Sequence, residues 1–281
     1  MLKKIDFARN FLETHHEQFL CPVCKQSFQL EGYSLICAQN HQFDLSKKGT
    51  IYFLSHSVQT EYNKKMLLHR GKMIQSGMYQ PILETIVDRM DLAGNTLDVG
   101  CGEGSFLFEL SKLGLNGPKF GFDISKDGIY LASNQPIEAF WSVADLTNLP
   151  FANQSMETIL NIFSPSHYQE FQRVLKKDGT VIKIIPEAHY LKELRAAFYP
   201  EDDIKQVYSN DKVLAKFSKE LDVLVDERIT FTFTIPKENR LDLLEMSPLE
   251  WSVAKEVKEA VQKNPLTEIT IDVRMLKGKV R

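Results

Sequence analysis

The chain has 281 residues, of which 43% are hydrophobic, and its formal net charge is −3. This is enough for a full hydrophobic core, in one large domain or in two unequal ones. The small negative charge excludes a general attraction to polyanions, so contacts with nucleic acid must come from local basic patches. No apolar run approaches the roughly 20 residues that span a bilayer, and no secretory signal begins the chain. We therefore expect no membrane partner and a cytoplasmic location.

The cysteines are concentrated near the N-terminus, where they have the spacing of metal ligands. The pattern is Cys21-x2-Cys24, twelve further residues, and then Cys37-x3-His41. Four such ligands close a tetrahedral shell, so we expect a structural zinc ion rather than a catalytic one. His15 and His16 are alternative ligands nearby, but neither is spaced to pair with a cysteine. A module this small has little core of its own, so zinc would drive its folding.

Three regions differ in pattern along the chain. Residues 1–54 combine a helical lead-in with short strand-like runs, which indicates a small zinc-ribbon-like module. Residues 55–80 are polar and rich in lysine, and we interpret them as a linker with a helical stretch. The segment Glu61–Lys72 gives that stretch a basic face. From residue 81 to residue 281 the pattern is that of a larger α/β domain.

Strands and helices alternate in this larger domain. We expect strands at Thr96–Val99, Lys119–Asp123, Phe140–Ala144, Thr158–Phe163 and Thr180–Ile185, with helices at Pro81–Met90, Ser105–Leu113, Ser125–Asn134 and Tyr168–Lys176. Such alternation predicts a mostly parallel sheet with helices on both faces. Further strand-like runs at Thr230–Ile235 and Glu268–Val273 predict an antiparallel edge.

A glycine-rich turn between the first predicted strand and its helix indicates a cofactor site. The turn is Asp98-Val-Gly100-Cys101-Gly102-Glu103-Gly104, followed by Asp123 after the second strand and Asp145-Leu146 after the third. Glycines allow the backbone to approach a ligand at a helix N-terminus. The second carboxylate can accept ribose hydroxyls, and the third can accept the adenine amino group while the leucine packs on the ring. We interpret Cys101 as a small residue beneath the cofactor.

Together these motifs, over residues 90–185, resemble the signature of class I S-adenosylmethionine-dependent methyltransferases. The resemblance implies an α/β, Rossmann-like fold with a doubly wound, mostly parallel sheet. Its cofactor would be S-adenosylmethionine.

Nearly the whole chain resembles the bacterial 23S rRNA guanine-N1 methyltransferases (ribosomal RNA large-subunit methyltransferase A). The segments that carry the resemblance are 21–24, 35–44, 48–54, 77–81, 186–194 and 246–251. It implies methylation of guanine N1 in a hairpin loop of domain II of 23S rRNA, near the macrolide site of the exit tunnel. The substrate would be 23S rRNA or an assembling large ribosomal subunit. It also implies a homodimer whose zinc modules recognise RNA, and one branch of the family is tied to resistance to tylosin-type macrolides.

The resemblance also points to further cofactor contacts. Tyr79 matches one of them. The family has a second contact, a histidine, directly before a Leu-x-Glu-Leu element. Here Tyr190 fills that position and His189 stands one residue earlier, so either could serve.

Guanine N1 carries a proton at neutral pH, so the reaction needs a base or a field that stabilises the anion. Asn161, His167 and Glu187 are the candidates, because they follow the fourth and fifth strands; Ser164 and His189 are further ones. Ordinary hydrogen bonding or a solvated surface position explains each of them better than a catalytic role, and no base is assigned.

Two features bear on the acceptor. Phe163 and Tyr168 could stack on a guanine or pack in the core. Lys64–Lys72, with Lys47 and Lys48, could contact phosphates or form a solvated helix face. Two alternatives stay open: a methyltransferase for a small metabolite, and a non-catalytic RNA-binding protein that retains the fold. The zinc module disfavours the first, and the intact cofactor motifs disfavour the second.

Overall fold

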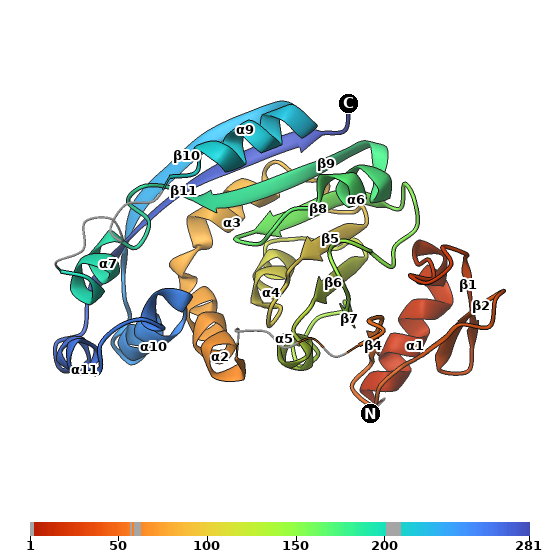
Figure 1. The fold of residues 1–281 in the computed structure, drawn as a ribbon, viewed down its shortest axis with the longest axis horizontal. Helices are drawn as coiled ribbons and strands as arrows, with labels where there is room; N and C mark the ends of the chain where they lie inside the picture. The colour runs from red at the N-terminus through yellow and green to blue at the C-terminus, as the bar shows by residue number, and fades with distance from the viewer. Residues whose placement is uncertain (1–2, 57, 59–62, 201–208) are drawn as a thin grey trace.

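A twisted sheet forms the centre of the computed structural model, with strand order β10-β11-β9-β8-β5-β6-β7-β4 (Figure 1). The structure describes residues 3–56, 58, 63–200 and 209–281. The strands are β4 Thr50–Tyr52, β5 Thr96–Val99, β6 Lys119–Asp123, β7 Phe140–Val143, β8 Met156–Ile162, β9 Leu175–Pro186, β10 Asp222–Thr234 and β11 Glu268–Lys279. Strands β4 to β9 pair in parallel, whereas β11 pairs antiparallel with both β9 and β10. The predicted parallel sheet with an antiparallel edge is therefore confirmed.

Helices cover both faces of this sheet. They are α1 Lys4–His15, α2 Lys64–Met73, α3 Gln80–Val87, α4 Ser105–Lys112, α5 Lys126–Ala132, α6 Tyr168–Val174, α7 Lys192–Phe198, α9 Asp211–Glu220, α10 Arg240–Glu245 and α11 Lys255–Lys263, with short turns η1 His16–Gln18, η2 Ile74–Met78, η3 Lys237–Asn239 and η4 Pro248–Glu250. Alternate residues of a strand face opposite sides. On β8, Leu160 and Ile162 belong to the core beneath α3 and α4, whereas Ile159 belongs to the core beneath α1 and α6. This is the doubly wound arrangement that the alternation predicts.

The strand order reverses between β5 and β8. From β5 the chain adds β6 and β7 on one side, and then returns to add β8 and β9 on the other. In open α/β sheets, ligands bind outside the carboxyl ends of the strands at such a reversal. The fold therefore directs attention to the residues that follow β5, β6 and β8.

The N-terminal module shares the hydrophobic core of the large domain. Its own small sheet contains β1 Phe28–Glu31, β2 Ser34–Cys37 and β3 Gln42–Asp44, but β4 pairs with β7 of the main sheet. The Phe19 ring lies 5.7 Å from that of Phe120 and 5.2 Å from that of Phe151. A strand pairing and an aromatic cluster therefore join the two sides of the predicted boundary after residue 54.

The predicted linker is largely part of the large domain. Residues 57 and 59–62 of the predicted 55–80 segment lie outside the described residues. From Lys64 onward, α2 and η2 bury apolar side chains, among them Leu67 and Met73, against the main core. Only one face of this polar sequence needs to be apolar for the helix to pack. The polar composition of this segment therefore suggested a linker, whereas the structure has a packed helix there.

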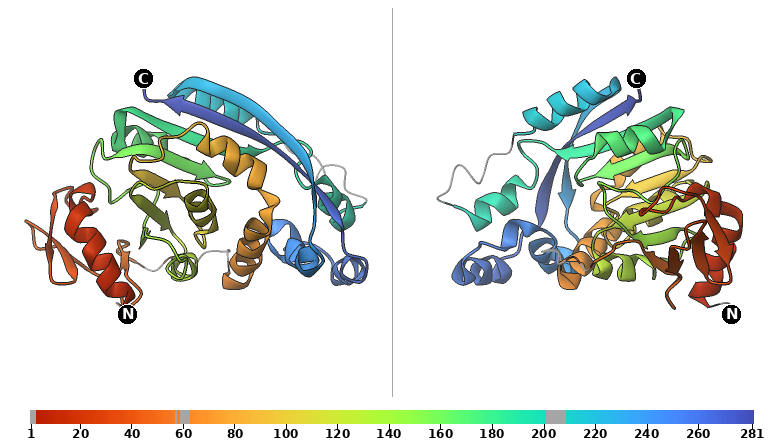
Figure 2. Two further views of the ribbon diagram at one scale, coloured as in Figure 1. Left: turned by 180° about the vertical axis from the view of Figure 1, so that it is seen from behind. Right: turned by 45° about the vertical axis from the view of Figure 1, so that its right-hand side comes forward.

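The C-terminal strands extend well beyond their predicted cores. Strands β10 and β11 form a long antiparallel pair that arches over one end of the sheet (Figures 1 and 2). Between them lie α10, which packs on α2, and α11. No helix in the described part of the chain is long and apolar enough to cross a membrane.

Candidate functional site

Two turns of the N-terminal module bring four metal-ligating side chains together. The ligand atoms of Cys21, Cys24, Cys37 and His41 all lie within 4.8 Å of one another. Cys24 Sγ is 3.6 Å from Cys37 Sγ, and His41 Nδ1 is 3.4 Å from Cys37 Sγ. His41 Nδ1 is also 3.5 Å from Cys21 Sγ. The four predicted ligands are thus assembled as a cluster.

The spacing of these atoms fits a zinc ion. Zn–S bonds of about 2.3 Å and Zn–N bonds of about 2.0 Å place tetrahedral neighbours roughly 3.5–3.8 Å apart. The two ligand turns each contain one residue with a φ of 60°, Lys25 in the first and Asn40 in the second. The alternative ligands His15 and His16 lie outside the cluster, on α1 and η1. Four protein ligands leave no open position, so the zinc is structural.

The zinc turns also hold the loop that follows β7. Asn148 Nδ2 donates to the carbonyl of Pro22 at 3.1 Å, and the Leu20 N–H donates to the carbonyl of Pro150 at 3.0 Å. The same loop begins with residues 145–146, two of the predicted cofactor contacts. The metal centre therefore supports a wall of the cofactor site.

The first of two adjoining cavities lies at the carboxyl ends of β5, β6 and β7, and we call it the glycine-loop cavity. Its volume is about 300 Å³. Six of the predicted cofactor residues line it: Gly100, Gly102, Glu103, Asp123, Asp145 and Leu146. Cys101 lies in the same wall and is buried, as a small residue beneath a ligand would be.

Asp123 fixes the shape of the glycine loop. Its Oδ2 accepts from the Gly102 N–H at 2.9 Å, and its Oδ1 accepts from the Ser125 N–H at 2.7 Å. Gly100 has a φ of +68°, and a Cβ there would lie 2.8 Å from Cβ of Ser164. Only glycine meets both conditions, because a side chain would be strained and would collide with the loop after β8.

Buried carboxylates give the glycine-loop cavity a negative potential. Asp98 lies on β5 directly before the lining residues Val99 and Gly100, and its Oδ2 is buried with no hydrogen-bond partner among the described residues. Burial, together with the nearby charges of Glu103 and Asp123, raises the pKa of Asp98 to about 8. Burial also raises the pKa of Glu103 and of Asp123. S-adenosylmethionine, which carries a sulfonium, an ammonium group and ribose hydroxyls, fits this donor and charge pattern.

The remaining predicted cofactor residues lie elsewhere. Gly104 packs under a ring, since a Cβ there would lie 2.7 Å from Cη2 of Trp141. Tyr79 and Tyr190 line the second cavity, where their hydroxyls are 2.6 Å apart. His189 lines neither cavity, and its backbone N–H donates to a carboxylate of β11. Of the two alternatives for the family contact, Tyr190 is thus the one that faces a cavity.

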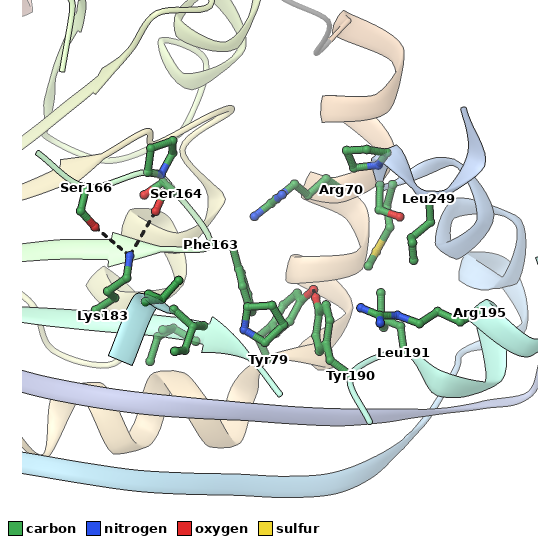
Figure 3. Close-up of a pocket in the computed structure, with 18 of the residues that line it drawn as sticks. Arg70, Tyr79, Phe163, Ser164, Ser166, Lys183, Tyr190, Leu191, Arg195 and Leu249 are labelled. Atoms are coloured by element: carbon green, nitrogen blue, oxygen red, sulfur yellow. Dashed lines mark hydrogen bonds between the residues drawn. The ribbon is translucent and has the colours of Figure 1, made fainter. Parts of the chain in front are cut away.

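The second cavity is larger and carries the opposite charge; we call it the cationic cavity (Figure 3). Its volume is about 850 Å³. Among the described residues that line it are five cationic side chains and no carboxylate: Arg70, Lys183, Arg195, Lys212 and Lys216. Its aromatic residues are Tyr79, Phe163, Tyr168, Tyr190 and Tyr199. This concentration of positive charge contrasts with the net charge of −3 for the chain.

The two cavities share a wall made by Arg70, Phe163, Ser164 and Pro165. Phe163 has a φ of 54°, which is rare for an aromatic residue and costs about 1–3 kcal/mol. Its ring stacks on that of Tyr190, with centroids 5.4 Å apart, and the Arg70 guanidinium lies 5.8 Å from its centroid. A strained aromatic residue therefore stands where two ligands would meet.

None of the three candidate bases, Asn161, His167 and Glu187, lines either cavity. Asn161 is buried, and its amide donates to the carbonyl of Pro165 at 2.8 Å. His167 caps the N-terminus of α6, where Nδ1 accepts from the Glu170 N–H. Glu187 pairs with Arg274 of β11 and lines neither cavity. Each of them thus has a hydrogen-bonding role within the fold.

Sequence reasoning missed Lys183, which lies within the cationic cavity. It is 3% exposed on β9, and its Nζ donates to Asn161 Oδ1 at 2.5 Å (the residue opposite it on β8) and to Ser166 Oγ at 2.9 Å. The signal was present, because Lys183 interrupts the otherwise apolar core of the run Thr180–Ile185. A lysine in a buried strand needs a specific reason.

The sheet order, the glycine-loop cavity and the zinc cluster define a class I S-adenosylmethionine-dependent methyltransferase with an N-terminal zinc ribbon. A family model of methyltransferase domains matches residues 91–227, and a zinc-ribbon model described as the N-terminal part of RlmA matches residues 19–58.

Three curated relatives identify the family more closely. A Bacillus subtilis (strain 168) protein, named a 23S rRNA (guanine-N1)-methyltransferase, is 36% identical over 99% of both chains. The 23S rRNA (guanine(748)-N1)-methyltransferase of Streptomyces fradiae is 22% identical over 82% of this chain and 85% of its own. A Micromonospora griseorubida protein, also named a 23S rRNA (guanine-N1)-methyltransferase, is 24% identical over 82% of this chain and 86% of its own. The chain belongs to the 23S rRNA (guanine-N1)-methyltransferase family.

Proposed function

We propose that this enzyme transfers the methyl group of S-adenosylmethionine to N1 of a guanine in a hairpin loop of domain II of 23S rRNA. One observation carries the assignment of the two substrates. An anionic cavity with the cofactor motifs shares the wall Arg70, Phe163, Ser164 and Pro165 with a larger cationic, aromatic-lined cavity. The cofactor would occupy the first cavity and the guanine the second.

The second cavity has the chemistry of a nucleic-acid acceptor site. Cationic side chains bind phosphates, and aromatic rings stack on bases that have left a helix. Lys212 and Lys216, one turn apart on α9, would contact the backbone, while Phe163 and Tyr190 would hold the ring. A base in a loop is cheaper to extrude than a paired one, which favours a hairpin loop as substrate.

A second basic surface supports RNA binding by the zinc module. Lys48 of that module and Lys64 of α2 lie 4.9 Å and 5.0 Å from the ring centroid of Tyr130 on α5. Tyr130 is exposed, and the neighbouring Lys47 is exposed as well. These residues join the module, α2 and α5 into one surface that would contact phosphates beside the acceptor loop.

Each substrate has its own contribution to the chemistry. S-adenosylmethionine supplies an electrophilic methyl group. The chain holds the acceptor ring beside Phe163, and its walls exclude bulk water from one side of that ring. Guanine must also lose its N1 proton, and none of the three predicted bases lines the glycine-loop cavity or the cationic cavity.

Radiolabelled methyl transfer followed by primer extension tests the proposal. The purified protein is incubated with tritiated S-adenosylmethionine and either unmodified 23S rRNA or assembling large-subunit particles. Methylation at N1 blocks base pairing, so a new reverse-transcription stop in the domain II hairpin loop is expected, and it should disappear with Asp123→Asn. Cofactor binding without transfer to either RNA substrate would contradict the proposal and favour a small-molecule acceptor.

The family resemblance extends the proposal to the assembly and location of the enzyme. We expect it to act in the cytoplasm as a homodimer, close to the macrolide site of its substrate. Light scattering on the purified chain measures its mass in solution and so tests the homodimer. Macrolide susceptibility of cells with and without the protein measures the consequence of the modification.

A further inference from the structure

Lys183 occupies an unusual position for a cation. Strand β9 pairs in parallel with β8, and this register sets Lys183 directly beside Asn161. The side chain is 3% exposed and points toward Ser164 and Ser166 at the wall of the cationic cavity (Figure 3). A buried lysine is costly unless its charge is matched.

The partners of Lys183 are neutral. Its Nζ donates to Asn161 Oδ1 at 2.5 Å, to Ser166 Oγ at 2.9 Å and to the Ser164 carbonyl at 3.3 Å. Among the described residues, no salt bridge joins Lys183 to a carboxylate, and no carboxylate lines its cavity. Three acceptors use all three protons of an ammonium group. The longest bond, to the Ser164 carbonyl, is the one that an oxygen of a ligand would replace.

Asn161 couples this charge to the cofactor site. Its amide donates to Ser164 Oγ at 2.5 Å, and Ser164 Oγ in turn donates to the Val99 carbonyl at the end of β5. Ser164 also belongs to the wall that both cavities share. Lys183 is therefore linked through Asn161, by two hydrogen bonds, to the wall where the methyl group and its acceptor would meet.

We propose that Lys183, as an ammonium group, contacts O6 of the acceptor guanine and stabilises the negative charge that forms when N1 loses its proton. This inference rests on the proposed function. The N1 proton leaves to water at the open side of the cavity, and its electron pair remains on N1 and O6. That pair forms the new N1–C bond while the methyl–sulfur bond breaks and its electrons stay on sulfur. The ammonium group keeps its proton throughout.

Two arginines and three of the tyrosines around the cavity do not change their charge in the relevant pH range. Burial lowers the pKa of Lys183 to about 8, so the ammonium form predominates at pH 7. Burial raises the pKa of Tyr79, Tyr168 and Tyr190, which stay neutral below pH 10. Arg70 of α2 and Arg195 of α7 keep their charge. The lysines of α9, Lys212 and Lys216, are addressed by a control variant.

The test compares the pH dependence of kcat for three variants at Lys183. Lys183→Gln keeps a donor for Asn161 and Ser166 but has no charge, Lys183→Met keeps only the shape, and Lys183→Arg keeps the charge. We expect kcat of the Gln and Met variants to fall about 100-fold at pH 7. This deficit should shrink to less than about tenfold at pH 9.5, because wild-type Lys183 has then lost most of its own charge and the guanine loses its proton without help. Lys183→Arg should keep kcat at pH 7 within about threefold of the wild type, because it keeps a positive charge at this position.

Several measurements separate this role from a structural one. Thermal unfolding and S-adenosylmethionine affinity should stay near wild type, and RNA affinity should change less than about threefold. The control Lys212→Gln should raise KM for RNA without moving the pH profile. A deficit of equal size at every pH, or a roughly 100-fold loss of kcat at pH 7 in the folded Lys183→Arg variant, would overturn the proposal, even if the neutral variants did not fold. Wild-type enzyme that methylated no RNA would instead contradict the proposed function.

Discussion

The glycine-loop cavity and the cationic cavity are neighbours with opposite charge. Glu103, Asp123 and Asp145 face the first, whereas five cations and no carboxylate face the second among the described residues. They share the wall that contains Phe163 and Ser164. A cationic donor and a polyanionic acceptor would thus each be drawn to its own side. Because their charges are opposite, the two adjoining cavities can bind different substrates and still hold the reacting atoms of both close together.

Loss of zinc should have the largest effect on stability, and it should disturb the glycine-loop cavity more than the cationic cavity. Cys24→Ser removes a ligand, and the module that it holds contributes Phe19 to the shared core. Removing a structural zinc ligand destabilises such modules strongly, so we expect the midpoint of thermal unfolding to fall by about 10 °C or more. Affinity for S-adenosylmethionine should also fall, because Asn148 would lose its contact with the zinc turn.

The control for the zinc prediction is Cys101→Ser, which changes a cysteine outside the cluster. Differential scanning fluorimetry with and without a chelator measures both variants. An unchanged unfolding midpoint in Cys24→Ser, or in the chelated wild type, would contradict a structural metal.

Asp123→Ala should disable the glycine-loop cavity alone. It removes the acceptor for the Gly102 and Ser125 N–H groups and the proposed acceptor for ribose hydroxyls. Losing charge-assisted hydrogen bonds of this kind costs about 2–3 kcal/mol, or roughly 100-fold in affinity for S-adenosylmethionine. Calorimetric titration measures this, with Asp127→Ala on the exposed surface of α5 as the matched control. An equal loss of RNA affinity would show that the two cavities are not separate.

The double variant Lys212→Gln/Lys216→Gln should weaken the second cavity alone. Each lysine that contacts a phosphate contributes about 1 to the slope of log affinity against log salt. We expect roughly tenfold weaker RNA binding at physiological salt and a slope smaller by about 2. Affinity for S-adenosylmethionine should not change, and Lys219→Gln on the same helix is the control. A slope identical to the wild type would remove α9 from the RNA site.

Affinity for S-adenosylmethionine and affinity for RNA should change in opposite directions with pH. These changes should be smaller than those caused by the substitutions above. The pKa of Asp98 is about 8, so raising the pH from 6 to 8 ionises a carboxylate next to the lining residues of the first cavity. A cationic ligand binds the ionised form better, so affinity for S-adenosylmethionine should rise several-fold and flatten in Asp98→Asn. Affinity for RNA should fall above pH 8, by less than about threefold, as Lys183 loses its charge. Parallel trends would contradict the charge assignment.

The sequence predicted the first cavity well because its residues follow strand ends in short local segments. Gly100, Gly102, Asp123 and Asp145 each lie at the end of a strand that alternation reveals or within three residues of it, and parallel strands bring such ends together. The zinc ligands were predictable for a similar reason, since their spacing is local. The order of the sheet followed from the same alternation.

The second cavity could not be predicted in the same way. Arg70, Lys183, Arg195 and Lys212 come from α2, β9, α7 and α9, and only the folded chain brings them together. Of these elements, α2 was predicted as part of a linker, and α9 was not predicted, because a helix that buries only one face has an ordinary polar composition. The contact between the N-terminal module and the main sheet could not be predicted for a related reason, since the pairing of β4 with β7 is a long-range contact.

A crystal structure with S-adenosylhomocysteine and a domain II RNA hairpin would show directly which substrate each cavity binds. We expect the cofactor product to lie between Asp123 and Asp145, with its sulfur toward Phe163 and Ser164. An extruded guanine should lie in the cationic cavity, with N1 toward that sulfur and O6 toward Lys183. A guanine bound outside the cationic cavity, or a cofactor product lying within it, would contradict the account.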